Sequence, residues 1–309
     1  MCGFLVVGSS ELELQVFNDA LNQAAYRGPD HQHVSINNGI TWGFNRLSIM
    51  DLSSKGNQPF VYKDCVLVCN GEVYNYHSLK AMLETDYTFK SGSDCEVLIP
   101  LYHKYGIEIL CKFLDAEFAM VIYDAKKDKI LAARDPMGIR PMFYGYHKED
   151  GKICFASEAK GLFPLCQEIM PFPPGHYYED GKFICYNDLS NPKTINNDDL
   201  ETIAINLRLK LEKAVEKRLQ SDAPIGYLLS GGLDSSLVCA IAARLNDQPI
   251  KTFAIGMDTD PIDLKYAKQV ADYLGTDHTE VIMTKEDLLE NLRDVIFHLE
   301  TYDITTIRA

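Results

Sequence analysis

A polar segment at residues 187–199 divides the sequence into two parts that follow different patterns. The segment is rich in Asn and Asp and carries no hydrophobic period, which is typical of a linker. Before it, hydrophobic runs are joined by Asn-Gly and Asp-Gly pairs, and after it strand-like and helix-like runs alternate. A chain of 309 residues has room for two domains. We therefore predict one domain over residues 1–190 and a second over residues 191–309.

The first part predicts an α+β domain built on antiparallel hairpins. Asn-Gly and Asp-Gly supply the positive φ that tight hairpin turns need, and they lie within three predicted hairpins, at residues 33–47, 143–156 and 176–186. Further strands are expected at residues 4–7, 65–69, 117–123 and 130–134. Two Ser-x-x-Glu capping boxes, at residues 10–13 and 93–96, each predict the start of a helix, and a third helix is expected after residue 75. Antiparallel strands enclosing a few helices are typical of an α+β fold.

The second part predicts a parallel sheet. A first helix is expected over residues 200–215, and three strands then alternate with three helices. The strands are expected at residues 225–229, 250–255 and 279–282, and the helices at residues 235–245, 263–274 and 286–299. This order is typical of a doubly wound α/β domain.

Composition narrows the class of protein. The net charge of -14 leaves no basic face for a phosphate backbone, so no nucleic-acid partner is expected. No apolar run reaches the roughly 18 residues of a membrane helix, and the start of the chain lacks the basic region of a secretory signal. Nine cysteines with no C-x-x-C pair do not indicate a disulfide framework or a zinc site. The sequence thus predicts a cytoplasmic protein with neither a nucleic-acid nor a membrane partner.

Cys2 is a candidate nucleophile. If Met1 is removed, one residue carries both a thiol and a free α-amine, and an amine with a pKa of roughly 7.7 suits a general base at neutral pH. The thiol needs such a base because only the thiolate attacks a carbonyl carbon. The apolar residues 4–7 would hold this terminus in a strand. The alternative is a buried, inert cysteine.

The second domain carries a glycine-rich loop, Ser230-Gly231-Gly232-Leu233-Asp234-Ser235, between a predicted strand and a predicted helix. Backbone N–H groups of such a loop can surround an anion at a helix N-terminus. The loop lacks the lysine of a Walker motif. Its alternative interpretation is a glycine turn with helix caps.

Several short motifs appear in a fixed order along the chain. They are Arg27-Gly28-Pro29-Asp30, Arg46-Leu47-Ser48-Ile49, Asn70-Gly71-Glu72-Val73-Tyr74-Asn75, Ser91-Gly92-Ser93-Asp94-Cys95-Glu96, Arg134-Asp135-Pro136-Met137-Gly138-Ile139-Arg140-Pro141 and Phe155-Ala156-Ser157-Glu158-Ala159-Lys160. With Cys2 they resemble the class II glutamine amidotransferases, and with the glycine-rich loop and residues 300–309 the whole chain resembles the glutamine-dependent asparagine synthetase family. The resemblance implies an Ntn-hydrolase four-layer αββα sandwich followed by a Rossmann-like PP-loop domain of enzymes that split ATP into AMP and pyrophosphate.

The resemblance implies a glutaminase site in the first domain. Cys2 would attack the side-chain amide of glutamine, and its own amine would relay the proton. The Asn70 side chain and the Gly71 N–H would form the oxyanion hole, where one donor typically lowers the barrier by about 3 to 4 kcal/mol.

The resemblance also implies residues that hold the glutamine itself. Arg46 would bind the α-carboxylate, which a planar guanidinium fits, while Glu72 and Asp94 would bind the α-amino group. Taken alone, a surface salt bridge explains Arg46 and a helix cap explains Asp94.

For the second domain the resemblance implies an ATP site. Its residues would be Leu229, Ser230, Gly231, Gly232, Asp234, Ser235 and Ile255. Asp234 would also help to hold Mg, while Thr305, Thr306 and Arg308 would lie in the aspartate and intermediate region. Leu229 and Ile255 are also expected to be buried strand residues.

The implied reaction joins two sites. Aspartate and ATP would give β-aspartyl-AMP, and ammonia released at Cys2 would travel through a dry channel and displace AMP. A homodimer is left open. The alternatives are a glutaminase whose second half is not catalytic, and a synthetase acting on another carboxylate, which the presence of Cys2 disfavours.

Two departures from the family pattern bear on these expectations. Glu117 stands where an apolar residue is usual, which puts the lining of the channel in question. The family pattern also continues past the position of Ala309. We therefore expect a complete glutaminase half and an incomplete synthetase half.

Overall fold

The structure is a computed structural model that describes residues 1–9, 12–192, 194–259 and 261–301. It contains two compact units, Met1–Ile195 and Asn196–Ala309. The division falls within the predicted linker, shortly after the predicted boundary at residue 190.

The first unit contains two six-stranded sheets, and every strand pairing in them is antiparallel. The first sheet has the order β10-β8-β9-β1-β3-β2. Its strands are β1 (Gly3–Val7), β2 (His31–Asn37), β3 (Ile40–Arg46), β8 (Phe143–His147), β9 (Ile153–Ala156) and β10 (Cys166–Pro171). Because β1 pairs with β3 on one side and β9 on the other, the N-terminal strand lies inside the sheet rather than at its edge.

The second sheet has the order β12-β11-β7-β6-β5-β4. Its strands are β4 (Phe60–Tyr62), β5 (Cys65–Val73), β6 (Ala116–Asp124), β7 (Lys129–Arg134), β11 (His176–Glu179) and β12 (Lys182–Cys185). The edge strands β4 and β10 are not predicted by the sequence pattern. β4 has three residues and β10 carries a break in its pairing register, so neither shows a period.

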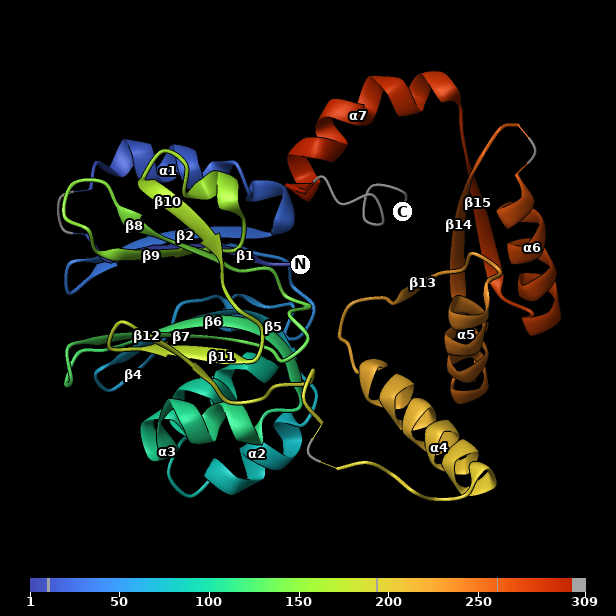
Figure 1. The fold of residues 1–309 in the computed structure, drawn as a ribbon, viewed down its shortest axis with the longest axis horizontal. Coiled ribbons are helices and arrows are strands. Elements are labelled where there is room, and N and C mark those ends of the chain that lie inside the picture. Colours follow the sequence, from blue (N-terminus) through green and yellow to red (C-terminus); the bar gives the residue numbers. More distant parts are fainter. Residues whose placement is uncertain (10–11, 193, 260, 302–309) are drawn as a thin grey trace. The chain divides into compact units, whose positions relative to one another are not determined.

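Helices cover the outer faces of both sheets (Figure 1). α1 (Leu14–Asn22) packs on the first sheet, while α2 (Tyr76–Leu83) and α3 (Leu98–Phe113) pack on the second. Short 3-10 helices precede or join these elements: η1 (Ala25–Arg27), η2 (Ser54–Gly56), η3 (Asp94–Val97) and η4 (Ala159–Gly161). The expected four layers, αββα, are thus present.

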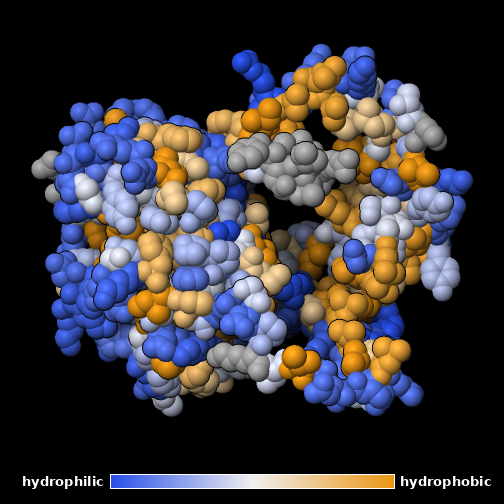
Figure 2. Space-filling view, viewed as in Figure 1, coloured by the Kyte–Doolittle hydropathy of each residue, from blue (hydrophilic) through white to orange (hydrophobic). Residues whose placement is uncertain are grey.

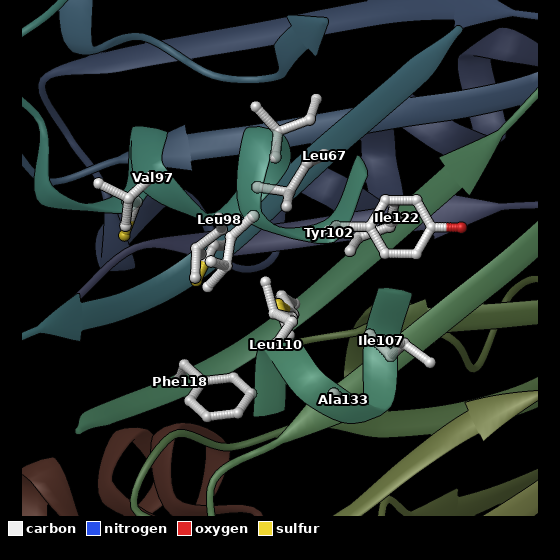
Figure 3. Packing of buried hydrophobic residues seen from close by; sticks show 14 of the residues in the cluster. Leu67, Val97, Leu98, Tyr102, Ile107, Leu110, Phe118, Ile122 and Ala133 are labelled. Carbon is white, nitrogen blue, oxygen red and sulfur yellow. The ribbon is translucent and has the colours of Figure 1, made fainter. Parts of the chain in front are cut away.

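Three hydrophobic clusters separate these four layers. One lies between the first sheet and α1, one between the two sheets, and the largest between the second sheet and the pair α2 and α3. Figure 3 shows this largest cluster, where Leu98 and Leu110 of the helical layer face Leu67, Phe118 and Ile122 of the sheet. We call the middle cluster the inter-sheet core.

The three predicted hairpins are confirmed. Asn38 and Gly39 both have positive φ, as do Asp180 and Gly181, which matches the turn type that Asn-Gly and Asp-Gly favour. The turn of the hairpin at residues 143–156 is wider, and among its residues only Gly151 has positive φ.

Neither capping box is confirmed. Ser10 and Glu11 lie outside the described residues, and the helix starts after Glu13, which makes no side-chain cap. The Ser93 side chain makes no cap either. The Glu96 carboxylate accepts hydrogen bonds from Tyr87, Lys90 and Ser91 instead.

The second unit has the predicted alternation of strands and helices. Its elements are α4 (Leu200–Arg218), β13 (Gly226–Leu228), α5 (Leu233–Leu245), β14 (Lys251–Met257), α6 (Ile262–Leu274), β15 (Asp277–Met283) and α7 (Lys285–Leu299). The strands pair in parallel in the order β13-β14-β15. The reversal of strand order that defines a doubly wound sheet is not among these strands, so that part of the expectation stays a prediction.

Large apolar side chains are exposed along the second unit, and they include Leu288, Leu292 and Ile296 of α7 (Figure 2). Within the described residues, α7 has no buried side chain. None of the described helices is both long and apolar enough to cross a membrane.

Candidate active site

Cys2 lies directly before β1, is half-buried, and packs against the inter-sheet core. Its Sγ accepts a hydrogen bond from the Leu47 N–H at 3.3 Å, and its S–H reaches the Leu47 carbonyl at 3.4 Å. Both backbone groups of the residue that follows β3 therefore hold the sulfur in place. The thiol is therefore not fully buried, and its reactivity stays a prediction.

The pKa values of two ionisable groups at the N-terminus are shifted in opposite directions. Burial raises the pKa of the Cys2 thiol, although the Leu47 hydrogen bond and the terminal amine act against this shift. Burial lowers the pKa of the terminal amine, which Met1 carries here. At neutral pH the thiol therefore keeps its proton and needs a base, while the amine gives up its own more readily.

β5 presents Asn70 and Glu72 to the inter-sheet layer. Val66 and Val68 of the same strand belong to the inter-sheet core, and side chains two residues apart share a face. Asn70 is 1% exposed, and its Nδ2 has no hydrogen-bond partner among the described residues. A buried amide donor without a partner costs free energy, so it indicates a site where a ligand supplies the acceptor.

Gly71 lies between these two residues and leaves no room for a side chain. A Cβ at this position would lie 2.7 Å from the Glu117 carbonyl and 2.9 Å from the Phe118 Cβ. The glycine therefore allows β5 and β6 to approach closely beside Asn70.

Carboxylates gather around Glu72 at this end of the sheet. Glu117 is paired directly opposite Glu72 on β6, and the Arg140 Nη2 lies 3.7 Å from the Glu117 Oε2. Burial, together with the nearby charge of Asp94, raises the pKa of Glu72 to about 8. The charge on Glu72 also acts on the Cys2 thiol and on the terminal amine, which places the acidic cluster beside the nucleophile.

Asp94 is buried and its Oδ2 accepts a hydrogen bond from the Val73 N–H at 2.6 Å. Burial raises its pKa, with this hydrogen bond acting the other way. The aspartate therefore ties η3 to the end of β5, which is more than a helix cap does.

Arg46 is 5% exposed, so the surface salt bridge interpretation is wrong. Its Nη1 donates to the Ser53 carbonyl at 2.6 Å and to the Asn57 Oδ1 at 2.7 Å, and its Nη2 donates to the carbonyls of Met50 and Asp51. Both terminal nitrogens thus hold the loop at residues 50–57.

Sequence reasoning missed Arg140 as a site residue, although its motif was noted. The Asp135 carboxylate accepts from the backbone N–H groups of Met137, Ile139 and Arg140. These bonds fold residues 135–140 into a tight loop that points Arg140 toward Glu117. The two arginines of the motif, with Asp135 between them, were the available signal.

In the second unit the glycine-rich loop lies between β13 and α5, as predicted. Gly231 has positive φ, and a Cβ there would lie 2.5 Å from the Tyr266 carbonyl carbon. The Ser230 N–H donates to the Ser235 Oγ at 3.2 Å, and the Gly232 N–H reaches the Ser230 Oγ at 3.5 Å. Serine hydroxyls thus occupy two of the backbone groups that would surround an anion.

Of the remaining residues predicted for the ATP site, some lie as expected and others do not. Leu229 is buried and Asp234 lies in the first turn of α5. Ile255 is 58% exposed, so its expected burial is wrong. Ile255 shares its face of β14 with Lys251 and Phe253, and all three are exposed in the described structure. Thr305, Thr306 and Arg308 lie outside the described residues.

Comparison with known proteins supports the two-part organisation. A family described as "Glutamine amidotransferase domain" matches residues 1–174, and one described as "Asparagine synthase" matches residues 206–309. Relatives named asparagine synthetase (glutamine-hydrolyzing) are found in Schizosaccharomyces pombe, where the name is qualified as probable, in Zea mays, and in Escherichia coli, where the name is asparagine synthetase B. They are 40%, 41% and 42% identical to this chain.

The match covers 100%, 100% and 92% of this chain but 60%, 55% and 54% of those relatives. The chain therefore spans little more than half the length of the curated relatives it matches. Among solved structures, glutamine phosphoribosylpyrophosphate amidotransferase from B. subtilis aligns with a TM-score of 0.53 at 16% identity, covering 99% of this chain and 95% of that one. This likeness shows a shared fold. The chain belongs to the glutamine amidotransferase domain family, and its second part matches the asparagine synthase family.

Proposed function

We propose that the chain is a glutamine-dependent asparagine synthetase in which residues 1–190 form the glutaminase domain and residues 191–309 belong to the synthetase domain. The observation that carries the proposal is the unpaired amide of Asn70, buried in the same inter-sheet layer against which Cys2 packs. The names of the relatives supply asparagine synthesis and glutamine hydrolysis. The family resemblance adds aspartate and ATP as substrates, and AMP and pyrophosphate as products.

Removal of Met1 would place the free amine on Cys2 itself. The amine takes the thiol proton, and the thiolate forms a bond to the side-chain carbonyl carbon of glutamine. The carbonyl π electrons move to the oxygen, giving a tetrahedral oxyanion. Burial raises the pKa of the Cys2 thiol, so the thiol keeps its proton until a base such as this amine removes it.

The oxyanion receives hydrogen bonds from the Asn70 Nδ2 and the Gly71 N–H. Because the Asn70 donor is already buried and unpaired, it needs no reorganisation when charge develops on the substrate. The C–N bond then breaks, and the amine returns its proton to the leaving ammonia. Water hydrolyses the thioester to give glutamate.

Glutamine is held by its α-ammonium group and by its α-carboxylate. Glu72 and Asp94 bind the α-ammonium, for which at least one of them must be ionised. Arg46 binds the α-carboxylate, and for that its guanidinium must exchange bonds to the 50–57 loop for bonds to the substrate.

ATP would bind at the glycine-rich loop, with the carbonyl and N–H groups of Leu229 and Ile255 near the base. Ser230 and Ser235 would release the loop N–H groups to the pyrophosphate. Within the described residues no three acidic, His or Cys side chains gather as a metal site. Asp234 alone fits Mg, because Mg is usually held by one or two carboxylates together with phosphate oxygens. Bound Mg would neutralise phosphate charge.

The full reaction is tested by incubating the purified chain with glutamine, aspartate and Mg-ATP, and measuring glutamate, asparagine and pyrophosphate. The proposal predicts glutamate from residues 1–190, and asparagine and pyrophosphate only where the synthetase half is complete. Glutamate without asparagine or pyrophosphate would leave only the glutaminase, and no glutamate would contradict the proposal. Cys2→Ala should abolish glutamate formation while any ammonia-dependent synthesis continues. The cytoplasmic location and a homodimer stay predictions.

A further inference from the structure

Two motifs far apart in the sequence meet on the main chain of Cys2. Arg27, of the Arg-Gly-Pro-Asp motif, donates from its Nε to the Cys2 carbonyl at 2.9 Å. Its Nη1 forms an ion pair with the Glu158 Oε1, also at 2.9 Å. The reaction described above assigns no role to either residue, although both belong to motifs that the sequence analysis singled out.

Glu158 is the centre of this contact and is 5% exposed. Besides Arg27, it accepts hydrogen bonds from the Tyr26 hydroxyl at 2.5 Å and from the Lys160 Nζ at 2.7 Å. Burial alone would raise the pKa of Glu158, but the bonds from Lys160, Tyr26 and Arg27 bring it below its usual value. The carboxylate therefore stays ionised and keeps hold of the guanidinium.

The local backbone is built around the same contact. A Cβ at Gly3 would lie 3.3 Å from the Arg27 Cδ, so the glycine lets the Arg27 side chain lie along the start of β1. Ser157 holds the next residue, because its Oγ accepts from the Phe4 N–H at 3.0 Å and its N–H donates to the Phe4 carbonyl at 3.0 Å. The segment 157–160 thus fixes β1 at two successive points.

Such an arrangement suits a nucleophile at a chain terminus. Once Met1 is removed, no residue precedes Cys2, and terminal residues fray unless they are tied down. The Arg27 bond to the carbonyl is one of few contacts left to fix the rotation of that residue. The third guanidinium nitrogen, Nη2, is buried without a partner in the described part of the chain, so Arg27 acts through the two bonds above.

We propose that Glu158 is a positioning residue for the glutaminase reaction: through Arg27 it fixes the Cys2 carbonyl, and with it the direction in which the thiol and the amine point. This inference rests on the proposed function. Because the network does not touch glutamine, its loss should slow the chemical step and leave substrate binding intact.

Asp124 offers a matched control within the same unit. It is also 5% exposed, and its carboxylate accepts from the Tyr102 hydroxyl at 2.8 Å and lies 3.1 Å from the Lys127 Nζ. It stands at the opposite end of β6 from Glu117, roughly 23 Å away at about 3.3 Å per residue. Glu158→Gln and Asp124→Asn therefore remove the same kind of tyrosine–carboxylate–lysine network at two different places.

The experiment measures glutamate formation, thermal stability and hydrogen exchange for both variants and the unchanged chain. Glu158→Gln should lower kcat on the order of 100-fold, as expected when a reacting group is misplaced by about 1 Å, and should change KM by less than about 3-fold. Asp124→Asn should lose comparable stability and keep kcat within about 2-fold. Tyr26→Phe removes one hydrogen-bond donor to Glu158 at a half-exposed position and should lower kcat by about 3- to 10-fold. This variant replaces Glu158→Gln in the test if Glu158→Gln does not fold.

Equal kcat values for Glu158→Gln and Asp124→Asn, or a change confined to KM, would overturn the inference. If the unchanged chain does not hydrolyse glutamine, the proposed function fails, and hydrogen exchange then decides the positioning role alone. Faster exchange of residues 3–7 in Glu158→Gln than in Asp124→Asn supports it, and equal exchange overturns it.

Discussion

Asn70 and Asn45 are both buried amides in this chain, and their hydrogen bonding differs. The Asn45 Nδ2 donates to the Leu21 carbonyl and its Oδ1 accepts from Gln32, whereas the Asn70 Nδ2 has no partner among the described residues. A satisfied amide stabilises the fold, and an unsatisfied one costs stability unless a ligand completes it. At the scale of single residues, this contrast separates a structural amide from a functional one.

The two amides should therefore respond differently to the same substitution. Asn70→Leu should lower kcat for glutamine hydrolysis by about 100- to 1000-fold, the usual effect of removing an oxyanion donor, with little loss of stability. Asn45→Leu should cost about 1 to 3 kcal/mol of unfolding free energy because it removes the buried bonds of this amide to the Leu21 carbonyl and to Gln32. Steady-state kinetics and urea unfolding check the pair. An active Asn70→Leu variant would remove this residue from the mechanism.

The acidic cluster predicts a pH dependence. Because Glu72 has a pKa of about 8, it is largely neutral at pH 6 and ionised at pH 9. Ionised Glu72 attracts the glutamine ammonium, so kcat/KM should rise with pH through about 8. Glu117 raises the pKa of Glu72, so Glu117→Met should move this rise to lower pH, while Arg140→Met should move it to higher pH. A profile that neither substitution moves would exclude Glu72 as the titrating group.

At the scale of elements, the start of α3 depends on a loop rather than a cap. The capping box at residues 93–96 fits the sequence pattern, but Glu96 bonds with the backbone N–H groups of Lys90 and Ser91 and with the hydroxyl of Tyr87. A capping pattern records only residue types at a spacing, and it cannot show which donors the preceding loop will bring. The hairpins at Gly39 and Gly181 are predictable because their turn chemistry is local.

Glu96→Gln should therefore destabilise the first unit more than loss of an ordinary cap does. The amide would turn an N–H₂ group or a weaker acceptor toward several donors, at a cost of about 3 kcal/mol, against about 1 kcal/mol for a cap. Urea unfolding of the variant checks this. A loss near 1 kcal/mol would mean that the loop bonds contribute little.

At the scale of the whole molecule, the two units differ in how much they bury. Among the residues that the structure describes, the first unit has three buried clusters and the second has one, with ten buried residues. Apart from the edge strands β4 and β10, the order of strands and helices in both units follows from hydrophobic period and turn residues. The candidate site does not, because Cys2, Asn70, Glu72, Arg140 and the Arg27 network meet only after the sheets pair. Cys2 was predicted from its own chemistry, Asn70 and Glu72 from family resemblance, and Arg140 was missed.

The difference in burial predicts two unfolding transitions. The chain has one tryptophan, Trp42, which is fully buried in the first unit. In urea, the helical circular dichroism signal should begin to fall at a lower concentration than the Trp42 fluorescence, as the second unit unfolds first. Coincident curves would show that the chain unfolds as one cooperative body.

The central claim is that the residue-2 thiol and its own unblocked amine carry out the attack on glutamine. It is tested most directly by treating the purified chain with a diazo-ketone analogue of glutamine and reading the N-terminal peptide by tandem mass spectrometry. The account predicts a peptide that lacks Met1 and carries one label on the Cys2 sulfur, with no label in the Cys2→Ala variant. A label on another cysteine, a labelled peptide that still begins with Met1, or no label at all would contradict it.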